Sequence, residues 1–63
     1  MERLRDMRED RDLYQSDLAK LLNVSQQTYS RYENDEISID KESLIKLALF
    51  YNTSVDYLLE LTD

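Results

Sequence analysis

The stretch QSDLAKLLNVSQQTYSRYEND, at Gln15–Asp35, decides the fold of this chain. It predicts two short helices joined by a tight turn, because apolar residues first recur at helical spacing and then stop. Asn23 interrupts the first helix, and Ser25 can cap the second by accepting a bond from a backbone N–H. Val24 and Tyr29 occupy the two positions of a hydrophobic staple around that cap. The residues that carry the first helical pattern are Leu18, Ala19, Leu21 and Leu22.

The second helix of this pair carries Gln26, Gln27 and Arg31 on one polar face. A glutamine amide can donate to and accept from adenine in the major groove, and an arginine can bind guanine or a phosphate. The alternative is a solvated surface, since glutamine favours helices and exposed arginines are common. We expect this face to contact double-stranded DNA.

The length of 63 residues leaves room for one domain, which we place at 1–63. The absence of cysteine and histidine excludes disulfides, His- or Cys-based metal sites and Ser–His or Cys–His nucleophiles. We expect no enzyme activity, no cofactor and no metal. No apolar run approaches the roughly 18 residues of a membrane span, so we expect a soluble, cytoplasmic protein without membrane contact.

The net charge of −6 is unusual for a DNA-binding chain, but it is unevenly distributed. Residues 1–31 contain six basic and six acidic side chains, whereas residues 32–63 contain two basic and eight acidic ones. The acidity therefore lies mostly outside the expected reading helix. It should still weaken non-specific DNA binding, because fewer phosphates are neutralised.

Five short helices account for nearly the whole chain, so the expected fold class is all-α. Besides the central pair, one helix covers about Glu2–Arg11, a fourth follows the cap Asp40 through Tyr51, and a fifth follows the cap Ser54. The residues expected to face inward from these three helices are Leu4, Met7, Leu44, Leu47, Ala48, Tyr51, Val55, Leu58 and Leu59.

The chain has neither glycine nor proline, although its helices need four turns. Helices often end at a residue in the left-handed conformation, which glycine adopts best and which asparagine and aspartate tolerate. The four breaks hold such residues, and we interpret them as helix stops rather than as ligand-binding groups. They are Asp12, Asn23, Asn34–Asp35 and Asn52.

Four blocks of sequence resemble the Cro/C1-type (Xre-like) helix-turn-helix domain family. They are LRDMR at 4–8, LYQSDLAKLLNVS at 13–25, SRYEN at 30–34 and SVDYLL at 54–59, and the resemblance covers about residues 3–59. It implies a compact five-helix, lambda-repressor-like domain with its helix-turn-helix at the second and third helices. It also implies a transcriptional regulator, a repressor rather than an activator, that binds an inverted-repeat operator as a homodimer.

The resemblance also assigns roles to individual residues. Gln26 and Gln27 match base-reading positions of the family, and Arg31 lies one turn beyond Gln27. Arg8 and Glu33 match a structural ion pair that ties the first helix to the third. The other DNA contacts that we expect are Gln15, Ser25, Thr28, Ser30 and Asn34.

A dimer contact is expected near the end of the chain, where Phe50, Tyr57 and Leu61 can form an apolar patch. Of the other four tyrosines, Tyr29, Tyr32 and Tyr51 fall on inward helix faces. We therefore expect core packing rather than stacking on single-stranded nucleic acid.

The chain departs from the family pattern at three kinds of position. Asp12, Asn23 and Asp35 stand where the family usually has glycine, and Tyr14 stands where a threonine or serine usually caps the second helix. Losing such a cap costs about 1 kcal/mol unless Ser16 or a shifted helix start compensates for it. Acidic residues also follow Asn34 where the family often has basic ones, which lowers the expected affinity for DNA.

Two alternatives keep the same fold. An antitoxin or an antirepressor partner would use the acidic C-terminal half as a protein-binding surface, with a toxin or antirepressor as the protein partner. A restriction–modification controller protein would remain a DNA-binding regulator in mechanism. The sequence does not separate these readings.

Overall fold

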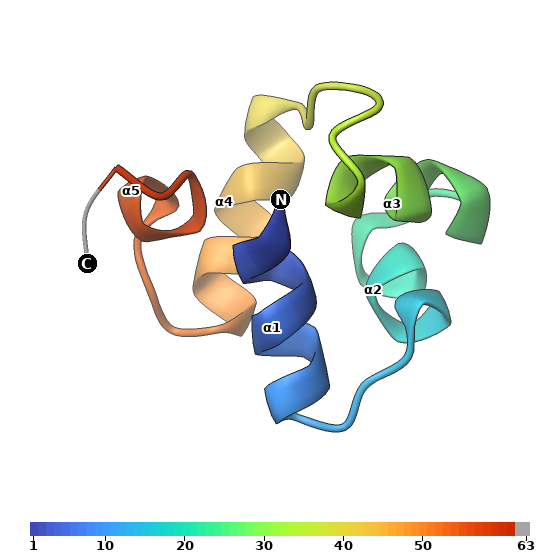
Figure 1. Cartoon of the computed structure of the whole chain (residues 1–63), viewed down its shortest axis with the longest axis horizontal. Helices are drawn as coiled ribbons and strands as arrows, with labels where there is room; N and C mark the ends of the chain where they lie inside the picture. Colours follow the sequence, from blue (N-terminus) through green and yellow to red (C-terminus); the bar gives the residue numbers. More distant parts are fainter. Residues whose placement is uncertain (62–63) are drawn as a thin grey trace.

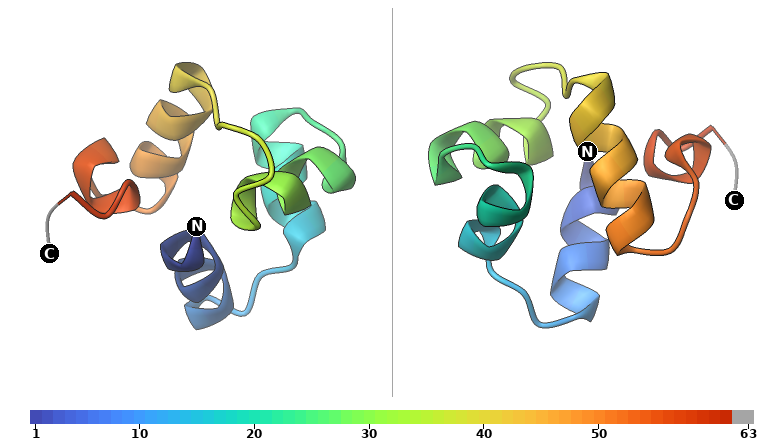
Figure 2. Two further views of the ribbon diagram at one scale, coloured as in Figure 1. Left: turned by 45° about the horizontal axis from the view of Figure 1, so that its top comes forward. Right: turned by 180° about the vertical axis from the view of Figure 1, so that it is seen from behind.

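The structure, a computed structural model, describes residues 1–61. Within that range the chain forms five helices and no strand, as the sequence predicts (Figure 1). Helices α2 and α3 lie on one side of the molecule and α5 on the other, with α1 and α4 between them (Figures 1 and 2). The helices are α1 at Glu2–Asp10, α2 at Gln15–Leu22, α3 at Gln26–Glu33, α4 at Lys41–Phe50 and α5 at Val55–Leu58.

Each helix contributes one side chain to the centre of the core. These five side chains are no more than 1% exposed, and they pack together in one cluster of buried residues. Burying an aliphatic or aromatic side chain of this size stabilises the fold by roughly 2–3 kcal/mol. The five are Leu4, Leu18, Tyr29, Leu47 and Leu58.

Side-chain caps begin α3, α4 and α5 as the sequence predicts. Ser25, Asp40 and Ser54 each accept a hydrogen bond from the backbone N–H three residues further on, at 3.1 Å in every case. Helix α2 begins differently. Tyr14 occupies its N-cap without a side-chain cap. Instead, the Asp17 carboxylate accepts a bond of 2.8 Å from the Tyr14 N–H.

The compensation at the start of α2 therefore comes from a residue other than the two possibilities that the sequence raised. Neither Ser16 nor a shifted start replaces the missing cap, since α2 begins at Gln15 and Asp17 makes the compensating bond. The physical reason is reach. A tyrosine hydroxyl is too far from its own backbone to cap, whereas a carboxylate three residues later can bond back to the N-cap N–H.

All five helices end in the same pair of backbone hydrogen bonds. A residue with φ between 55° and 61° donates its N–H to the carbonyl three residues earlier, and the next residue donates to a carbonyl five residues before it. This is the Schellman arrangement, which glycine usually closes. The residues in the left-handed conformation are Asp12, Asn23, Asp35, Asn52 and Glu60.

Three details of the helix ends differ from the sequence prediction. Helices α1 and α4 end one residue early, because Arg11 and Tyr51 occupy C-cap positions before the left-handed residue. Glu60 closes α5 in the same way, and no local sequence signal predicts a glutamate in the left-handed conformation at that position. Leu59 was wrongly expected to face inward: it is 38% exposed, because α5 is a single turn that ends at Leu58.

The left-handed conformation of Asn23 generates a test. Replacing Asn23 by glycine should raise the free energy of unfolding by up to about 1 kcal/mol, and replacing it by valine should lower it by about 1–2 kcal/mol. Valine is worst because its branched side chain clashes with the backbone at positive φ. Urea unfolding measures both effects.

Asn34 provides the matched control, because it ends the neighbouring helix α3 at an ordinary φ of −91°. The glycine and valine variants at position 34 should not show the same order of stability. Equal stabilities for the two variants at position 23 would contradict the interpretation of Asn23 as a left-handed helix stop.

Candidate nucleic-acid interface

Helix α3 has one buried face and one exposed face. Tyr29 and Tyr32 are buried, with their rings edge to face at a centroid distance of 6.5 Å, as expected for core tyrosines. The opposite face exposes Gln26, Gln27 and Arg31 to solvent. The structure thus places together, on one accessible surface, the three side chains that the sequence assigned to base reading.

Hydroxyl groups order the N-terminal end of this helix. Ser25 Oγ accepts the N–H of Thr28 and donates to Thr28 Oγ1 at 2.9 Å. Ser30, one turn further along, is half-buried. The hydrogen bonds between Ser25 and Thr28 therefore stabilise the first turn of α3, which contains Gln26 and Gln27.

A buried carboxylate, Glu33, fixes the other end of α3. Its side chain is inaccessible to solvent, and Arg8 of α1 binds it through two nitrogens, with Nε 2.7 Å from Oε2 and Nη2 3.2 Å from Oε1. Gln15 of α2 donates to Oε1 at 3.2 Å. Arg8 also donates to the carbonyl of Leu13 at 2.9 Å. Helices α1, α2 and α3 thus meet at a single charged group.

The surroundings of Glu33 determine its ionisation. Burial by itself would raise the pKa of this carboxyl, but the hydrogen bonds from Arg8 and Gln15, with the Tyr29 hydroxyl nearby, outweigh it and leave the pKa below its ordinary value. The bond to Glu33 raises the pKa of the Arg8 guanidinium. Burial, with Glu33 nearby, raises the pKa of the Tyr29 hydroxyl. This hydroxyl points towards the carboxylate without reaching strict hydrogen-bond geometry. Glu33 therefore remains charged in the folded chain at neutral pH.

Gln15 and Asn34, both expected to contact DNA, have partners within the chain. The Gln15 amide nitrogen donates to Glu33, and Asn34 Oδ1 accepts a bond of 2.8 Å from Arg5 Nη2. The bond from Arg5 orients the Asn34 amide. Its NH₂ group is the part that can donate to a phosphate.

Arg5 is a residue of this region that sequence reasoning missed. Besides its bond to Asn34, its Nε lies 3.7 Å from Glu33 Oε1, and its side chain is 45% exposed. The available signal was its spacing: Arg5 precedes Arg8 by three residues, so the two share a face of α1.

The residues of the expected dimer patch lie at the opposite side of the molecule, and two of them are partly covered. The Arg3 guanidinium lies over the ring of Tyr57, 4.3 Å from its centroid, and the Arg11 guanidinium lies over the ring of Phe50 at 5.6 Å, both as cation–π contacts. Leu61 is 72% exposed and is the most accessible of the three.

Residues 1–61 lack two features that are typical of other functional classes, a cluster of metal ligands and a membrane-spanning helix. No group of three or more acidic, histidine or cysteine side chains in this range could hold a metal ion. No helix in the same range is long and apolar enough to cross a membrane.

Comparison with known proteins agrees with this geometry. The family model described as Helix-turn-helix matches residues 4–58, which include all five helices in whole or in part. The two short helices joined at Asn23, with an exposed polar face on the second, define a helix-turn-helix protein. The chain belongs to the Cro/C1-type helix-turn-helix family.

Similar proteins are regulators of transcription. The HTH-type transcriptional regulator ImmR of Bacillus subtilis is 39% identical over 57 residues, covering 90% of this chain and 45% of the relative. The cryptic phage CTXphi transcriptional repressor RstR of Vibrio cholerae is 38% identical over 53 residues, covering 84% and 48%. A crystal structure of a transcriptional regulator from Listeria innocua superposes with a TM-score of 0.87 at 35% identity, covering 90% and 53%. The chain spans about half the length of these relatives.

The ion pair between Arg8 and Glu33 generates a test of stability. Glu33→Gln should lower the free energy of unfolding by about 3 kcal/mol, because it leaves the Arg8 guanidinium poorly solvated and without its carboxylate. A double-mutant cycle with Arg8→Met should give a coupling energy of about 2 kcal/mol.

A second cycle, with Arg5→Met and Asn34→Ala, serves as the control. That pair is exposed and should couple by less than about 1 kcal/mol. A coupling energy near zero between positions 8 and 33 would show that the ion pair does not tie α1 to α3.

The lowered pKa of Glu33 generates a separate test. A carboxyl whose pKa is lower in the folded chain stabilises the fold above its unfolded value, ordinarily 4.5, and loses this contribution as the pH falls through the folded pKa. Between pH 5 and pH 2, the free energy of unfolding should therefore fall less steeply for Glu33→Gln than for the wild type. Urea unfolding at each pH measures the slope, and Glu2→Gln controls for the loss of an exposed carboxylate. Parallel slopes for wild type and Glu33→Gln would contradict the lowered pKa.

Proposed function

We propose that this chain is a sequence-specific DNA-binding regulator that reads the major groove of an inverted-repeat operator with α3. One observation carries the proposal. Gln26, Gln27 and Arg31 are exposed on one face of α3, and the opposite face of this helix is buried in the core. Family membership and the regulators among its relatives support it. Residues 1–63 act in this proposal as one DNA-binding domain.

Base reading falls to the N-terminal part of α3, which is the part of a recognition helix that enters the groove. Gln26 and Gln27 pair with adenine through their amide groups, and Arg31 binds guanine or a phosphate. The Ser25 cap and the core contacts of Tyr29 hold this turn before DNA arrives. Binding to DNA then requires little further ordering of this turn.

Phosphate contacts orient the helix in the groove without reading sequence. Gln15 contributes from the N-terminus of α2, where the backbone N–H groups and the helix dipole favour an anion. Asn34 contributes through its NH₂ group. The hydroxyl-bearing residues Ser25, Thr28 and Ser30 provide the remaining polar contacts along the same edge.

The charge distribution sets the strength of this binding. The neutral half, residues 1–31, contains Arg31 and most of the other proposed contacts, while the net charge of −6 belongs to residues 32–63. Asp35 and Glu36 follow directly after Asn34 and repel phosphate. Affinity then depends on base contacts more than on general attraction, which favours specific over non-specific sites.

A homodimer completes the operator complex, because two-fold symmetry in the protein matches an inverted repeat. We place the dimer contact at Phe50, Tyr57 and Leu61, on the side away from α3. The dimer represses by occupying promoter DNA in the cytoplasm. No catalytic step is part of this function.

Selection of duplexes from a randomised DNA library tests the proposal. The wild type should enrich an inverted repeat at moderate salt. Gln27→Ala should relax the selection at one or two base pairs in each half-site, because an adenine loses its bidentate partner at a cost of about 1–3 kcal/mol. Arg31→Ala should weaken binding to the selected site by tenfold or more.

Lys46→Ala is the control for Arg31→Ala, since it removes an exposed cation from α4 on a different element. It should change affinity less than twofold. Enrichment of a single unrepeated site would remove the dimer from the proposal. Failure to enrich any sequence at any salt concentration would overturn DNA reading by this chain.

A further inference from the structure

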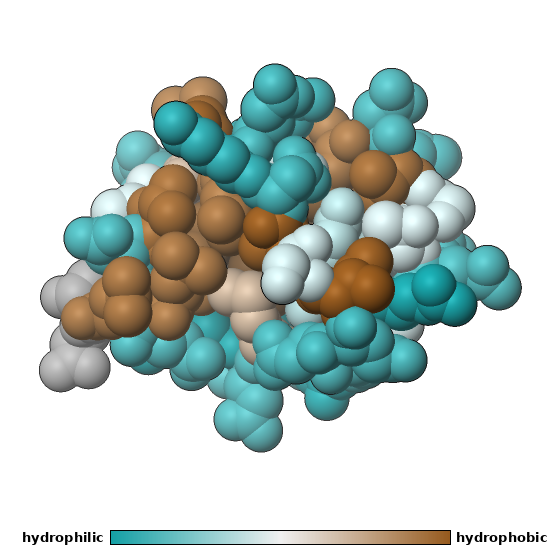
Figure 3. Space-filling view, turned by 90° about the horizontal axis from the view of Figure 1, so that it is seen from above, coloured by the Kyte–Doolittle hydropathy of each residue, from teal (hydrophilic) through white to brown (hydrophobic). Residues whose placement is uncertain are grey.

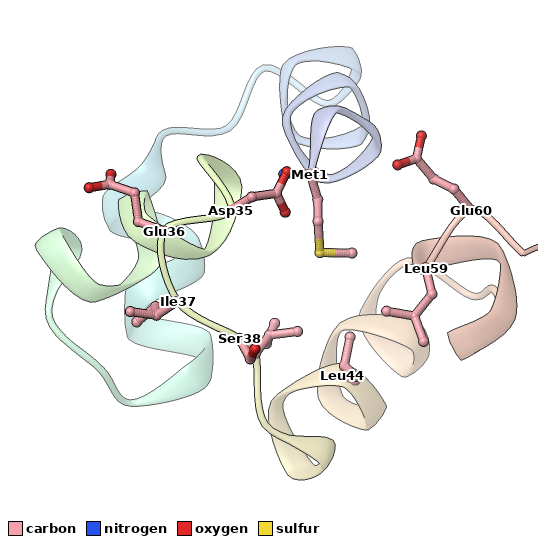
Figure 4. Close-up of a pocket in the computed structure, with 9 residues that line it drawn as sticks. Met1, Asp35, Glu36, Ile37, Ser38, Leu44, Leu59 and Glu60 are labelled. Atoms are coloured by element: carbon pink, nitrogen blue, oxygen red, sulfur yellow. The ribbon is translucent and has the colours of Figure 1, made fainter.

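A groove with a volume of about 460 Å³ lies on the face of the molecule above α4 and α5. It runs between the loop after α3, the first turns of α4, the end of α5 and the N-terminal residue. Figure 4 shows its residues, and Figure 3, which looks onto this face, shows apolar side chains gathered over α4 and α5. None of the proposed DNA contacts or dimer residues lines this groove.

The floor of the groove is apolar and rests on the core. Met1, Leu44 and Leu59 point into the space from three different elements (Figure 4). Ile39 also lines it, and both Ile39 and Met1 pack against the buried cluster. A floor attached to the core in this way is formed before any partner binds.

The rim of the groove is acidic. Asp35, Glu36 and Glu60 line it, and all three are exposed. Glu36 and Glu60 lie on opposite sides of the groove, and the Glu36 side chain points away from its centre (Figure 4). Asp35 pairs with the N-terminal ammonium of Met1, at 2.9 Å. Among the described residues that line the groove there is no lysine or arginine, and the N-terminal ammonium offsets Asp35 alone, so Glu36 and Glu60 give the rim its net negative charge.

We propose that this groove binds a cationic amphipathic segment of another protein. Such a segment would place apolar side chains on the floor made by Met1, Ile39, Leu44 and Leu59, with lysines or arginines at the acidic rim. Helix-in-groove recognition uses this division of labour, in which apolar anchors supply affinity and charges supply orientation and rate.

The charge on the rim disfavours the other occupants. A second copy of this chain docking face to face would bring like charges together, since each groove contributes the carboxylates of Glu36 and Glu60 besides the paired Asp35. A nucleic-acid backbone would be repelled for the same reason. Only a basic partner gains from both the floor and the rim.

The position of the groove gives such a partner a means of affecting α3. The rim residues Asp35 and Glu36 follow Asn34 directly at the end of that helix. A bound cationic segment would neutralise them beside the proposed phosphate contact. The docking proposal itself does not depend on DNA binding, and its test needs no DNA.

The probe is a fluorescent 15-residue peptide of leucine and lysine, with leucines at helical spacing on one face. Its comparison peptides are a scrambled sequence of the same composition and a leucine–glutamate peptide of the same pattern. Anisotropy should show that the patterned cationic peptide binds at least tenfold more tightly than either. Amide NMR shifts on binding should concentrate at Asp35–Ile39, Leu44 and Leu59–Glu60.

Two pairs of variants separate groove binding from general attraction. Asp35→Asn/Glu36→Gln/Glu60→Gln removes the rim charges, and Glu9→Gln/Asp10→Asn/Asp12→Asn removes three exposed charges elsewhere, including one at positive φ. Leu59→Ser removes part of the floor, and Leu49→Ser removes an exposed leucine outside it. The groove variants should each weaken binding at least tenfold and their controls less than twofold.

Thermal unfolding of every variant confirms that it is folded before binding is compared. Equal weakening by both charge variants, or shifts spread over the whole chain, would show non-specific attraction and overturn the proposal. Equal binding of the scrambled peptide would do the same. A doubling of mass with protein concentration, abolished by Leu59→Ser, would assign the groove to a second copy instead.

Discussion

The side-chain arrangement around α3 depends on satisfying one buried charge. Glu33 is 3% exposed and must be compensated by donors from its surroundings. Arg8 supplies two of them from α1 and Gln15 supplies one from α2, so a single carboxylate sets the relative positions of three helices. Apolar packing alone would permit small rotations of α3 about its axis. The hydrogen bonds to Glu33 restrict such rotations and act together with the burial of Tyr29 and Tyr32 on the inward face of α3.

The turns between helices show how such a small chain holds this arrangement without glycine. Each helix ends at a residue with positive φ, and asparagine or aspartate occupies four of the five positions. A residue with a Cβ atom is less stable there than glycine, but it also restricts the unfolded chain, so the two effects partly cancel. Caps at Ser25, Asp40 and Ser54 define the next helix within a few residues. The connections are consequently short, and the elements have little freedom relative to one another.

The helices could be predicted because their sequence signals are local. The tertiary contacts have no such local signal and could not be predicted. Caps, stops and apolar spacing lie within a few residues of each other, so Asp12, Asn23, Asp35 and Asn52 were interpreted correctly from sequence. Leu59 was misplaced because its exposure depends on how short α5 is. The link from Arg8 to Glu33 came from family resemblance, not from any pattern in the chain. Arg5 and the groove went unpredicted, because they join residues that lie far apart in the sequence. The roles of Gln26, Gln27 and Arg31 on DNA stay predictions, although their shared exposure could be inferred from helical spacing.

The helix ends also have a kinetic consequence. Every bond that closes a helix spans at most five positions, so each stop can form as soon as its own helix does. The chain contains no proline, so no X–Pro bond must isomerise, a step that takes tens of seconds where it occurs. Small helical domains rich in local contacts fold in microseconds to milliseconds. This chain should therefore refold in a single rapid phase, and a newly synthesised copy would expose its core only briefly to proteases or to aggregation.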